Sequence, residues 1–269
     1  MRDYISASQI KTYLTCGQRY MHKYILGIKV PYASGSLIRG NAIDAAANDH
    51  FVEKSDESSS KYNIGLGKND FVDLAVSSHD SIADEEPPEN WNKEKYESRD
   101  KTARFADLYH GSHGSKLKAK NKDSVQQKIL VELSFPETEK YDEKKVNLLG
   151  YIDLISDKNV VVDNKVSRSN SFKFLNRNLQ MVLYSLATGL KDVAIALIKD
   201  VKTPESHYIP TKISNAAISS TSQRVRDVLN GIEKEVFIPA ESGSWTCSSK
   251  WCEYWYICDY GEKAGKDNI

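Results

Sequence analysis

The chain has 269 residues, 40% of them hydrophobic and 28% charged, which is enough to bury the core of one globular domain. This composition excludes collagen-like, coiled-coil and wholly disordered chains. Basic and acidic residues number 37 each, so the net charge argues neither for nor against a nucleic-acid partner. No apolar run reaches the roughly 18 residues of a membrane span, and the first residues lack the apolar core of a signal peptide. We therefore expect a soluble, cytoplasmic protein without a membrane partner.

The N-terminal part of the sequence predicts helices. Residues 6–52 carry apolar and aromatic residues at helical spacing after a capping serine, and they predict two helices, the second from Ile38 to Phe51. Residues 53–123 then turn polar and predict an insertion with one helix, near Trp91 to Tyr109, between mobile loops. We expect this insertion to be a solvated surface segment.

After residue 123 the pattern changes to strands. Runs rich in β-branched residues predict a meander of three strands at 125–135, 146–156 and 159–167. The elements that follow are predicted as a helix, two strands and a helix, at 172–190, 193–201, 206–211 and 216–236. The order helix, three strands, helix, strand predicts an α/β sandwich rather than a doubly wound sheet. We expect residues 1–269 to form a single domain.

Three charged residues fall on two neighbouring predicted strands. Asp153 interrupts an apolar strand, where an unpaired carboxylate is costly to bury. Asp163 and Lys165 are two residues apart, so a strand places both side chains on one face. Asp153 lies opposite Asp163 if the turn is centred on residue 158, and Asp157-Lys158-Asn159 is a suitable turn sequence.

The chemistry of these residues suits a divalent cation. Two close carboxylates repel each other unless a hard cation such as Mg²⁺ or Mn²⁺ lies between them. Lys165 beside them can orient a water molecule or help to deprotonate it, which is the equipment for metal-assisted hydrolysis of a phosphodiester. The alternative is an exposed hairpin in which Lys165 pairs with an aspartate, because a D-x-K tripeptide also occurs by chance.

The wider pattern resembles a nuclease family. GYID, DNK ten residues later, and a helix with QMVLY resemble the PD-(D/E)XK nuclease superfamily, specifically its RecB-like branch, whose last helix carries Gln-x-x-x-Tyr. Here these two residues are Gln180 and Tyr184, one helical turn apart. The opening SASQIKTYLTCGQRY is similar to the start of RecB-like nucleases. The resemblance implies a restriction-endonuclease-like core, one nuclease domain, and a catalytic set of Asp153, Asp163, Lys165, Gln180 and Tyr184.

The resemblance also suggests the metal ligands. The family often carries a histidine ligand in a G-x-x-x-H helix, whereas Asp44 follows Gly40 here, and we expect Asp44 to replace the histidine. Asn164 lies between two inward-facing residues of its strand, so its backbone carbonyl is expected at the same edge. The predicted ligands of one Mg²⁺ or Mn²⁺ are therefore Asp44, Asp153, Asp163 and Asn164.

The four cysteines form a second pattern. One is near the N-terminus and three are near the C-terminus: Cys16, Cys247, Cys252 and Cys258. This arrangement resembles the iron–sulfur RecB-like nucleases, including AddB-type subunits and CRISPR-associated exonucleases, and implies a structural [4Fe–4S] cluster that closes the tail at 245–260 on Cys16. A four-cysteine zinc site and four free thiols are the alternatives.

Several basic residues follow the predicted site. Between Asn164 and Asn178 the sequence has only basic charges, at Lys165, Arg168, Lys173 and Arg177, and these residues could hold phosphates. Arg19, Lys23 and Arg39 are further candidates for a nucleic-acid channel.

These features together predict the function. We expect a metal-dependent DNA nuclease that acts on single strands or ends. The alternative is a catalytically weak or inactive DNA-binding accessory protein that retains the nuclease fold. An oligomer, and partner proteins of recombination or CRISPR systems, are compatible with either reading.

Overall fold

The computed structural model describes residues 3–29, 35–85, 94–135, 137, 142–168 and 171–261. The chain divides into two compact units, each assembled from separated segments. The first unit consists of residues 1–32, 130–150 and 215–269, and the second of residues 33–129 and 151–214. The single domain predicted over residues 1–269 stays a prediction. Within the described residues, no helix has the length and apolar character to cross a membrane.

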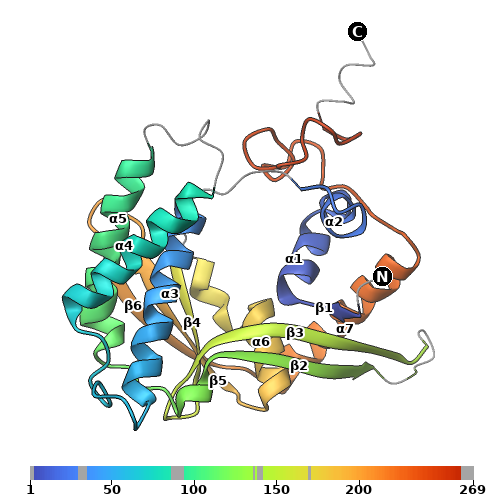
Figure 1. Cartoon of the computed structure of the whole chain (residues 1–269). Helices are drawn as coiled ribbons and strands as arrows, with labels where there is room; N and C mark the ends of the chain where they lie inside the picture. Colours follow the sequence, from blue (N-terminus) through green and yellow to red (C-terminus); the bar gives the residue numbers. More distant parts are fainter. Residues whose placement is uncertain are drawn as a thin grey trace. The chain divides into compact units, whose positions relative to one another are not determined.

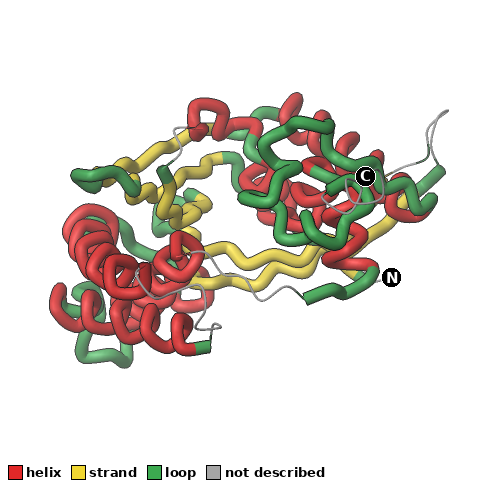
Figure 2. Tube along the Cα trace, turned by 90° about the horizontal axis from the view of Figure 1, so that it is seen from above, coloured by secondary structure: helices red, strands yellow, loops and turns green. Residues whose placement is uncertain are grey.

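Three helices lie side by side in the second unit (Figures 1 and 2). They are α3 (Gly35–Ser55), α4 (Lys68–Asp84) and α5 (Glu94–Tyr109), and a π-helical turn, His110–Gly114, continues α5. The prediction of one helix between mobile loops in residues 53–123 was therefore wrong, because α4 was missed. The buried stripe of α4 is Phe71, Ala75, His79 and Ala83. Only one of these is a large apolar residue, so the stripe gives a weak hydrophobic signal.

The strands predicted after residue 123 are all present and belong to one sheet. Neighbouring strands are β3 (Lys144–Ile155), β4 (Val161–Ser167), β5 (Asp192–Lys199) and β6 (Glu205–Lys212). β4 and β5 are parallel, while the other neighbours are antiparallel. A parallel pair needs a crossover, which here contains a 3₁₀ segment (Ser171–Arg177) and helix α6 (Leu179–Thr188). Gly189, at φ 73°, ends α6 in the left-handed conformation.

The two faces of this sheet are covered differently. Alternate residues Val162 of β4 and Ala194, Ala196 and Ile198 of β5 belong to the core that α3, α4 and α5 form. Asp163 and Lys165 therefore point to the opposite face, where α6 lies against β4. Polar groups from both faces can consequently approach the same stretch of β4.

The β3–β4 hairpin has the predicted register. Leu154 pairs with Val162, which centres the turn on residue 158 and places Asp153 opposite Asp163. Asn159 has φ 56°, a left-handed conformation that asparagine tolerates better than most residues. The sequence of a short turn therefore sets the position of two carboxylates.

The first unit holds both ends of the described chain. Its elements are β1 (Tyr4–Ile5), α1 (Ala7–Thr15), α2 (Gly17–Tyr20), a π-helical turn (Met21–Ile25) and α7 (Asn215–Glu233). β1 pairs in parallel with the start of β3, and β2 (Val125–Phe135) also pairs with β3. Gly17 N donates to Ile238 O over 2.7 Å, and a Cβ at Gly17 would lie 2.6 Å from Ile238 N. Only glycine permits this approach between the first helices and the tail.

Candidate active site

Asp163 and Lys165 form an ion pair on one face of β4. Lys165 Nζ donates to Asp163 Oδ1 over 3.0 Å and lies 2.9 Å from Oδ2, where the geometry is not that of a hydrogen bond. Asp163 is 1% exposed, whereas Lys165 is only partly buried. A buried carboxylate is thus joined to a cation that reaches solvent.

Helix α6 brings Gln180 and Tyr184 to the same carboxylate. The helix starts at Asn178, whose side-chain oxygen accepts from the backbone N–H of Gln180 over 3.0 Å. Gln180 Nε2 donates to Asp163 Oδ1 over 2.8 Å and to the Tyr184 hydroxyl over 3.1 Å. That hydroxyl donates to the backbone carbonyl of Tyr151 over 2.6 Å. The network links α6 to β3 and fixes one side of the site.

Asp153 lies where β3 and β4 separate. The two strands pair through Leu154 and Val162 near the turn. Beyond that pair, the backbone N–H of Asn164 donates to Asp153 Oδ2 over 2.7 Å. The backbone N–H of Asn164 thus bonds to the Asp153 carboxylate and not to a backbone carbonyl of β3. This bond brings Asp153 beside β4 at the level of Asp163.

A second polar network reaches the site from the helical face. Asn164 Nδ2 donates to Asp44 Oδ1 over 3.1 Å, and Gln126 Nε2 donates to Asp44 Oδ2 over 2.9 Å. The buried Tyr109 hydroxyl donates to Asn164 Oδ1 over 2.6 Å. Sequence reasoning selected Asp44 and the carbonyl of Asn164, but it missed Tyr109, Gln126 and the side chain of Asn164. Gln126 stands out in the structure rather than in the sequence, because its φ of 48° is unusual for a non-glycine residue.

Burial dominates the electrostatics of the three carboxyl groups. Burial raises the pKa of Asp153 well above its ordinary value, and the charges of Asp163 and Asp44 raise it further. Burial also raises the pKa of Asp163 and of Asp44, although Lys165 opposes both shifts. Burial alone would lower the pKa of Lys165, but Asp163 and Asp153 outweigh it and raise this pKa. Burial raises the pKa of Tyr184 to about 12, so its hydroxyl is a hydrogen-bond donor.

The donor set suits a hard divalent cation. Asp44, Asp153 and Asp163 offer carboxylate oxygens, the ligands that Mg²⁺ and Mn²⁺ prefer. In the structure, nitrogen donors already bond to these oxygens: the Lys165 ammonium and the Gln180 amide at Asp163, and side-chain amides at Asp44. Within the described ranges, no three histidine, cysteine, aspartate or glutamate side chains are close enough together to hold a metal ion. The ligand role of these residues therefore stays a prediction.

Arg39 was wrongly predicted to face a nucleic-acid channel. Its side chain is 8% exposed, and Nη2 donates to Asp200 Oδ2 over 3.0 Å. Nη1 donates to the Ser98 hydroxyl over 3.1 Å. A buried, paired guanidinium contributes to packing inside the second unit and does not meet a ligand.

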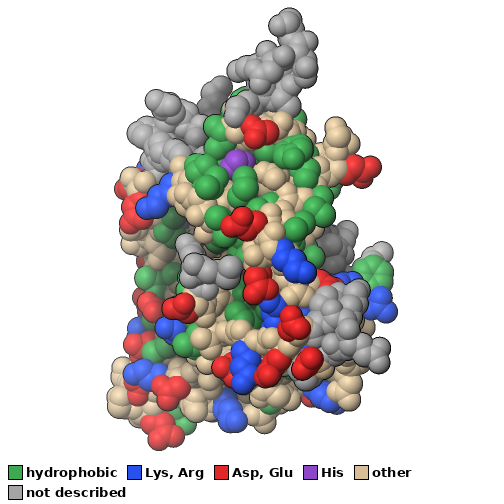
Figure 3. All heavy atoms as spheres, turned by 90° about the vertical axis from the view of Figure 1, so that its right-hand side faces the viewer, with side chains coloured by type: hydrophobic (Ala, Val, Ile, Leu, Met, Phe, Trp, Pro, Cys, Tyr) green, Lys and Arg blue, Asp and Glu red, His purple; other side chains and the backbone are tan. Residues whose placement is uncertain are grey.

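The other predicted basic contacts are scattered. Arg19 Nε donates to Glu253 Oε1 over 3.1 Å, and the side chain of Lys173 lies outside the described residues. Figure 3 shows basic and acidic side chains interspersed over the lower part of one face, without a continuous basic surface among the described side chains there. On this face, a nucleic-acid contact would need a local cluster of basic residues.

The four cysteines lie around one small cavity of the first unit. All four line it, together with residues that include His22 and Trp255. Cys16 Sγ accepts from the backbone N–H of Ala240 over 3.3 Å. Burial raises the pKa of Cys247, and the neighbouring thiols of Cys16 and Cys258 raise it further. The chain thus brings its N-terminal cysteine to the cysteine-rich tail, although the thiols are not arranged as a metal site.

Two solved structures and one family model resemble this chain. Among solved structures, a protein from Eubacterium rectale described as a candidate exonuclease superposes with TM-score 0.50 at 14% identity, covering 90% of this chain and 86% of that one. The protein SSO0001 gives TM-score 0.41 at 10% identity, covering 96% and 87% of the two chains. No curated protein matches in sequence. A family model of the PD-(D/E)XK nuclease superfamily matches residues 4–259. Because this match spans nearly the whole chain, the chain belongs to the PD-(D/E)XK nuclease superfamily.

Proposed function

We propose that this chain is a metal-dependent deoxyribonuclease that hydrolyses phosphodiester bonds in single strands or at ends. The observation that carries the proposal is the convergence of Asp153, Asp163 and Lys165 on adjacent strands of a nuclease-superfamily chain. The exonuclease description of the Eubacterium rectale protein belongs to that protein, and it is compatible with action on ends.

The side chains of Asp44, Asp153 and Asp163 and the backbone carbonyl of Asn164 would hold one Mg²⁺ or Mn²⁺. The chemistry that such a cation supplies is polarisation of the phosphoryl group and a lower pKa for a coordinated water molecule. Burial supports this assignment, because carboxylates that are costly to keep ionised gain most from a bound cation.

Among the candidate residues that would not bind the cation, Lys165 would act most directly on the reaction. Its ammonium donates to Asp163 Oδ1 over 3.0 Å and reaches solvent, so it can orient the attacking water and the phosphate or help to deprotonate that water. Gln180 and Tyr184 act as positioning residues, since their hydrogen bonds hold Asp163 and the backbone of β3 in place. Tyr109 holds Asn164 in the same way from the helical face.

The test is degradation of end-labelled single-stranded DNA with Mg²⁺ or Mn²⁺, compared with the same reaction in excess chelator. Asp163→Ala should abolish cleavage, while Asp157→Ala, an exposed residue of the adjoining turn, should cleave normally. Unchanged cleavage by Asp163→Ala would overturn the assignment. The same assay with RNA of the same sequence tests whether cleavage requires deoxyribose.

A second candidate function is a DNA-binding accessory protein without catalysis. Both carboxylate oxygens of Asp44, at the position where the family often has a histidine, accept from side-chain amides. If these two hydrogen bonds persist when a metal ion is present, Asp44 would bind that ion weakly. DNA binding without cleavage at any divalent metal concentration would favour this function, and would fit a subunit that works with recombination or CRISPR proteins.

We also propose that Cys16, Cys247, Cys252 and Cys258 hold a [4Fe–4S] cluster with a structural role, as in the iron–sulfur RecB-like branch. Support comes from the single cavity that all four cysteines line. A zinc ion with the same ligands is the alternative, and metal analysis separates the two.

A further inference from the structure

A basic hollow of about 510 Å³ lies at the carboxyl ends of the parallel strands β4 and β5. Helix α5 contributes Lys101 and Arg104, the end of β4 contributes Arg168, and the segment after β5 contributes Lys202. Asp200 is the acidic residue of its lining. None of these residues belongs to the carboxylate site.

The charge of this hollow is not balanced internally. Asp200 is buried and already accepts from Arg39 Nη2 over 3.0 Å, and Arg168 Nε donates to the same oxygen over 3.3 Å. Among the described residues, Lys101, Arg104 and Lys202 take part in no ion pair. The single carboxylate is thus shared with a buried arginine, and the exposed lining carries a surplus of positive charge.

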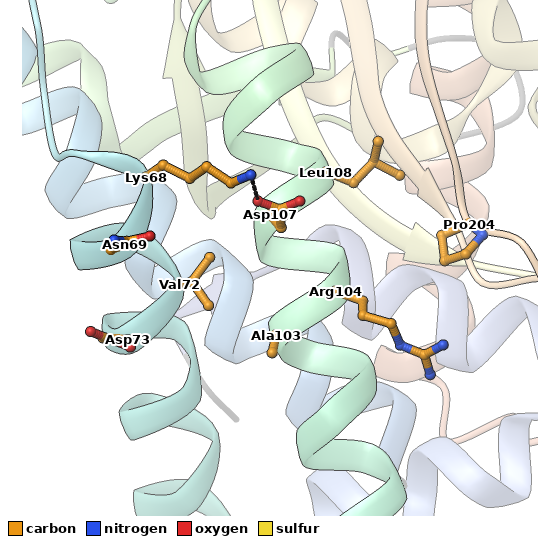
Figure 4. A pocket seen from close by; sticks show the side chains of 9 residues that line it. All are labelled: Lys68, Asn69, Val72, Asp73, Ala103, Arg104, Asp107, Leu108 and Pro204. Carbon is orange, nitrogen blue, oxygen red and sulfur yellow. Dashed lines mark ion pairs between the residues drawn. The ribbon is translucent and has the colours of Figure 1, made fainter.

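The neighbouring groove between α4 and α5 provides a contrast. Figure 4 shows Lys68 paired with Asp107 in this groove, while the side chain of Asp73, further along α4, points away from α5. Arg104 points away from α4, to the side of α5 on which Pro204 lies. Arg104 and Pro204 line both the groove and the hollow, so the two adjoin, and the basic surplus is on the side of Arg168 and Lys202.

The hollow lies a short distance along the chain from the carboxylates. Arg168 follows Lys165 by three residues, which is about 10 Å along an extended strand. Arg104, Arg168 and Lys202 are exposed and come from three different segments. These cations are too spread out to enclose one small anion. They suit a polymer, whose successive phosphates can each meet a different cation.

We propose that this hollow binds backbone phosphates of the nucleic-acid strand whose scissile phosphate lies at Asp163 and Lys165. The proposal rests on the proposed nuclease function and extends it, because it assigns a substrate-holding role to α5, a helix of the polar insertion. Contacts of this kind position the strand without reading its sequence.

The probe is a fluorescein-labelled oligothymidylate, with binding followed by anisotropy in chelator over a range of salt concentrations. The double variant Arg104→Gln/Lys202→Gln should bind several-fold more weakly, and its slope of log K against log salt should shrink by about 0.7 for each phosphate that the variant no longer binds. The matched control is Lys158→Gln/Lys212→Gln. It removes the same charge at the opposite ends of the strands, and it should bind like the wild type.

Binding and cleavage separate the two proposals. If the wild type cleaves DNA and the Arg104/Lys202 variant keeps wild-type affinity and salt slope, the hollow is not a phosphate site although the nuclease stands. If the variant loses affinity and the control does not, the hollow is supported even when the wild type fails to cleave. A wild type that binds no oligothymidylate overturns the hollow as a nucleic-acid site, as does equal loss in variant and control.

Discussion

Asp163 is held at one of its carboxylate oxygens by two side chains. Lys165 and Gln180 both donate to its Oδ1, and burial raises its pKa. A group held in this way is positioned by the fold, so its replacement should affect chemistry more than folding. The same reasoning applies to Lys165, whose ammonium is drawn toward the carboxylates and keeps one side in solvent.

Lys165→Gln should lower the turnover of bound DNA by about 10²- to 10⁴-fold, the usual loss when a group that handles the attacking water is removed. DNA affinity should change little. Single-turnover rates and dissociation constants measured on the same oligonucleotide check this, with Lys158→Gln as the control. A proportional loss of affinity with normal turnover would reduce Lys165 to a phosphate contact.

His50 provides a test of the core by pH. It is buried, its Nε2 bonds to the Gly114 carbonyl over 3.0 Å, and burial lowers its pKa to about 4. The unfolded chain takes up this proton below about pH 6.5, whereas the folded chain does so only near pH 4. The contribution of His50 is therefore complete above pH 6.5 and is lost as the pH falls toward 4.

We expect this residue to account for about 2 kcal/mol of lost stability between pH 7 and pH 5. Urea unfolding at the two pH values measures the loss, and His50→Phe should reduce it by that amount. The Gly114 carbonyl keeps its bond from Lys54 in the variant. A wild-type-like loss in His50→Phe would contradict the assignment.

At the scale of elements, the inserted helices are part of the core. Phe71 of α4 is fully buried and stacks on Tyr109 of α5 at 5.8 Å between ring centroids. Tyr109 in turn donates to Asn164 of β4. A continuous chain of contacts thus joins α4 to the strand that carries the candidate site.

Phe71→Ala should cost about 3–5 kcal/mol of unfolding free energy, which is typical of a buried phenylalanine. Ile64→Ala, at a residue that is 70% exposed in the same polar segment, should change stability by less than about 0.5 kcal/mol. Urea denaturation of both variants measures this. Equal, small effects would mean that α4 is a dispensable surface element.

The sequence predicts the elements whose signals are local. The strands and the turn at 157–159 follow from alternation and turn residues, and the register follows from the turn. The helix predicted over 172–190 was wrong at its start, because a 3₁₀ segment spans Ser171–Arg177 and α6 begins only after its cap Asn178. Helix α4 was missed because its buried stripe includes alanines and a histidine. Motif spacing selected Asp153, Asp163, Lys165, Gln180 and Tyr184 as candidate site residues; the structure brings their side chains close together, and their catalytic roles stay predictions. Tyr109 and Gln126 were missed because their partners lie 55 and 82 residues away in sequence.

At the scale of the whole molecule, two kinds of metal chemistry are assigned to two different units. The expected superfamily is confirmed by the family match over residues 4–259. The iron–sulfur branch stays a proposal that depends on the cysteine cavity, where residue 16 meets the tail. Closing so long a loop stabilises a fold chiefly by restricting the unfolded chain.

Protein purified without oxygen should be brown and contain about four irons per chain. Cys16→Ser should lose iron and thermal stability, whereas Ser249→Ala, an exposed residue of the same tail, should keep both. A brief treatment with a chelator that removes Mg²⁺ should stop cleavage while the colour persists. One zinc per chain would replace the iron assignment, and four free thiols in a stable protein would remove the site.

We propose that Asp153 and Asp163 together hold one divalent cation. Calorimetric titration of Mn²⁺ into chelator-treated, DNA-free protein tests it most directly. Wild type and Asp157→Asn should each bind one Mn²⁺ per chain. Asp163→Asn should bind Mn²⁺ much more weakly. Its loss of affinity should exceed the about 10- to 100-fold loss that is typical when a residue behind a metal ligand is changed. Equal Mn²⁺ affinity in all three proteins would contradict the claim.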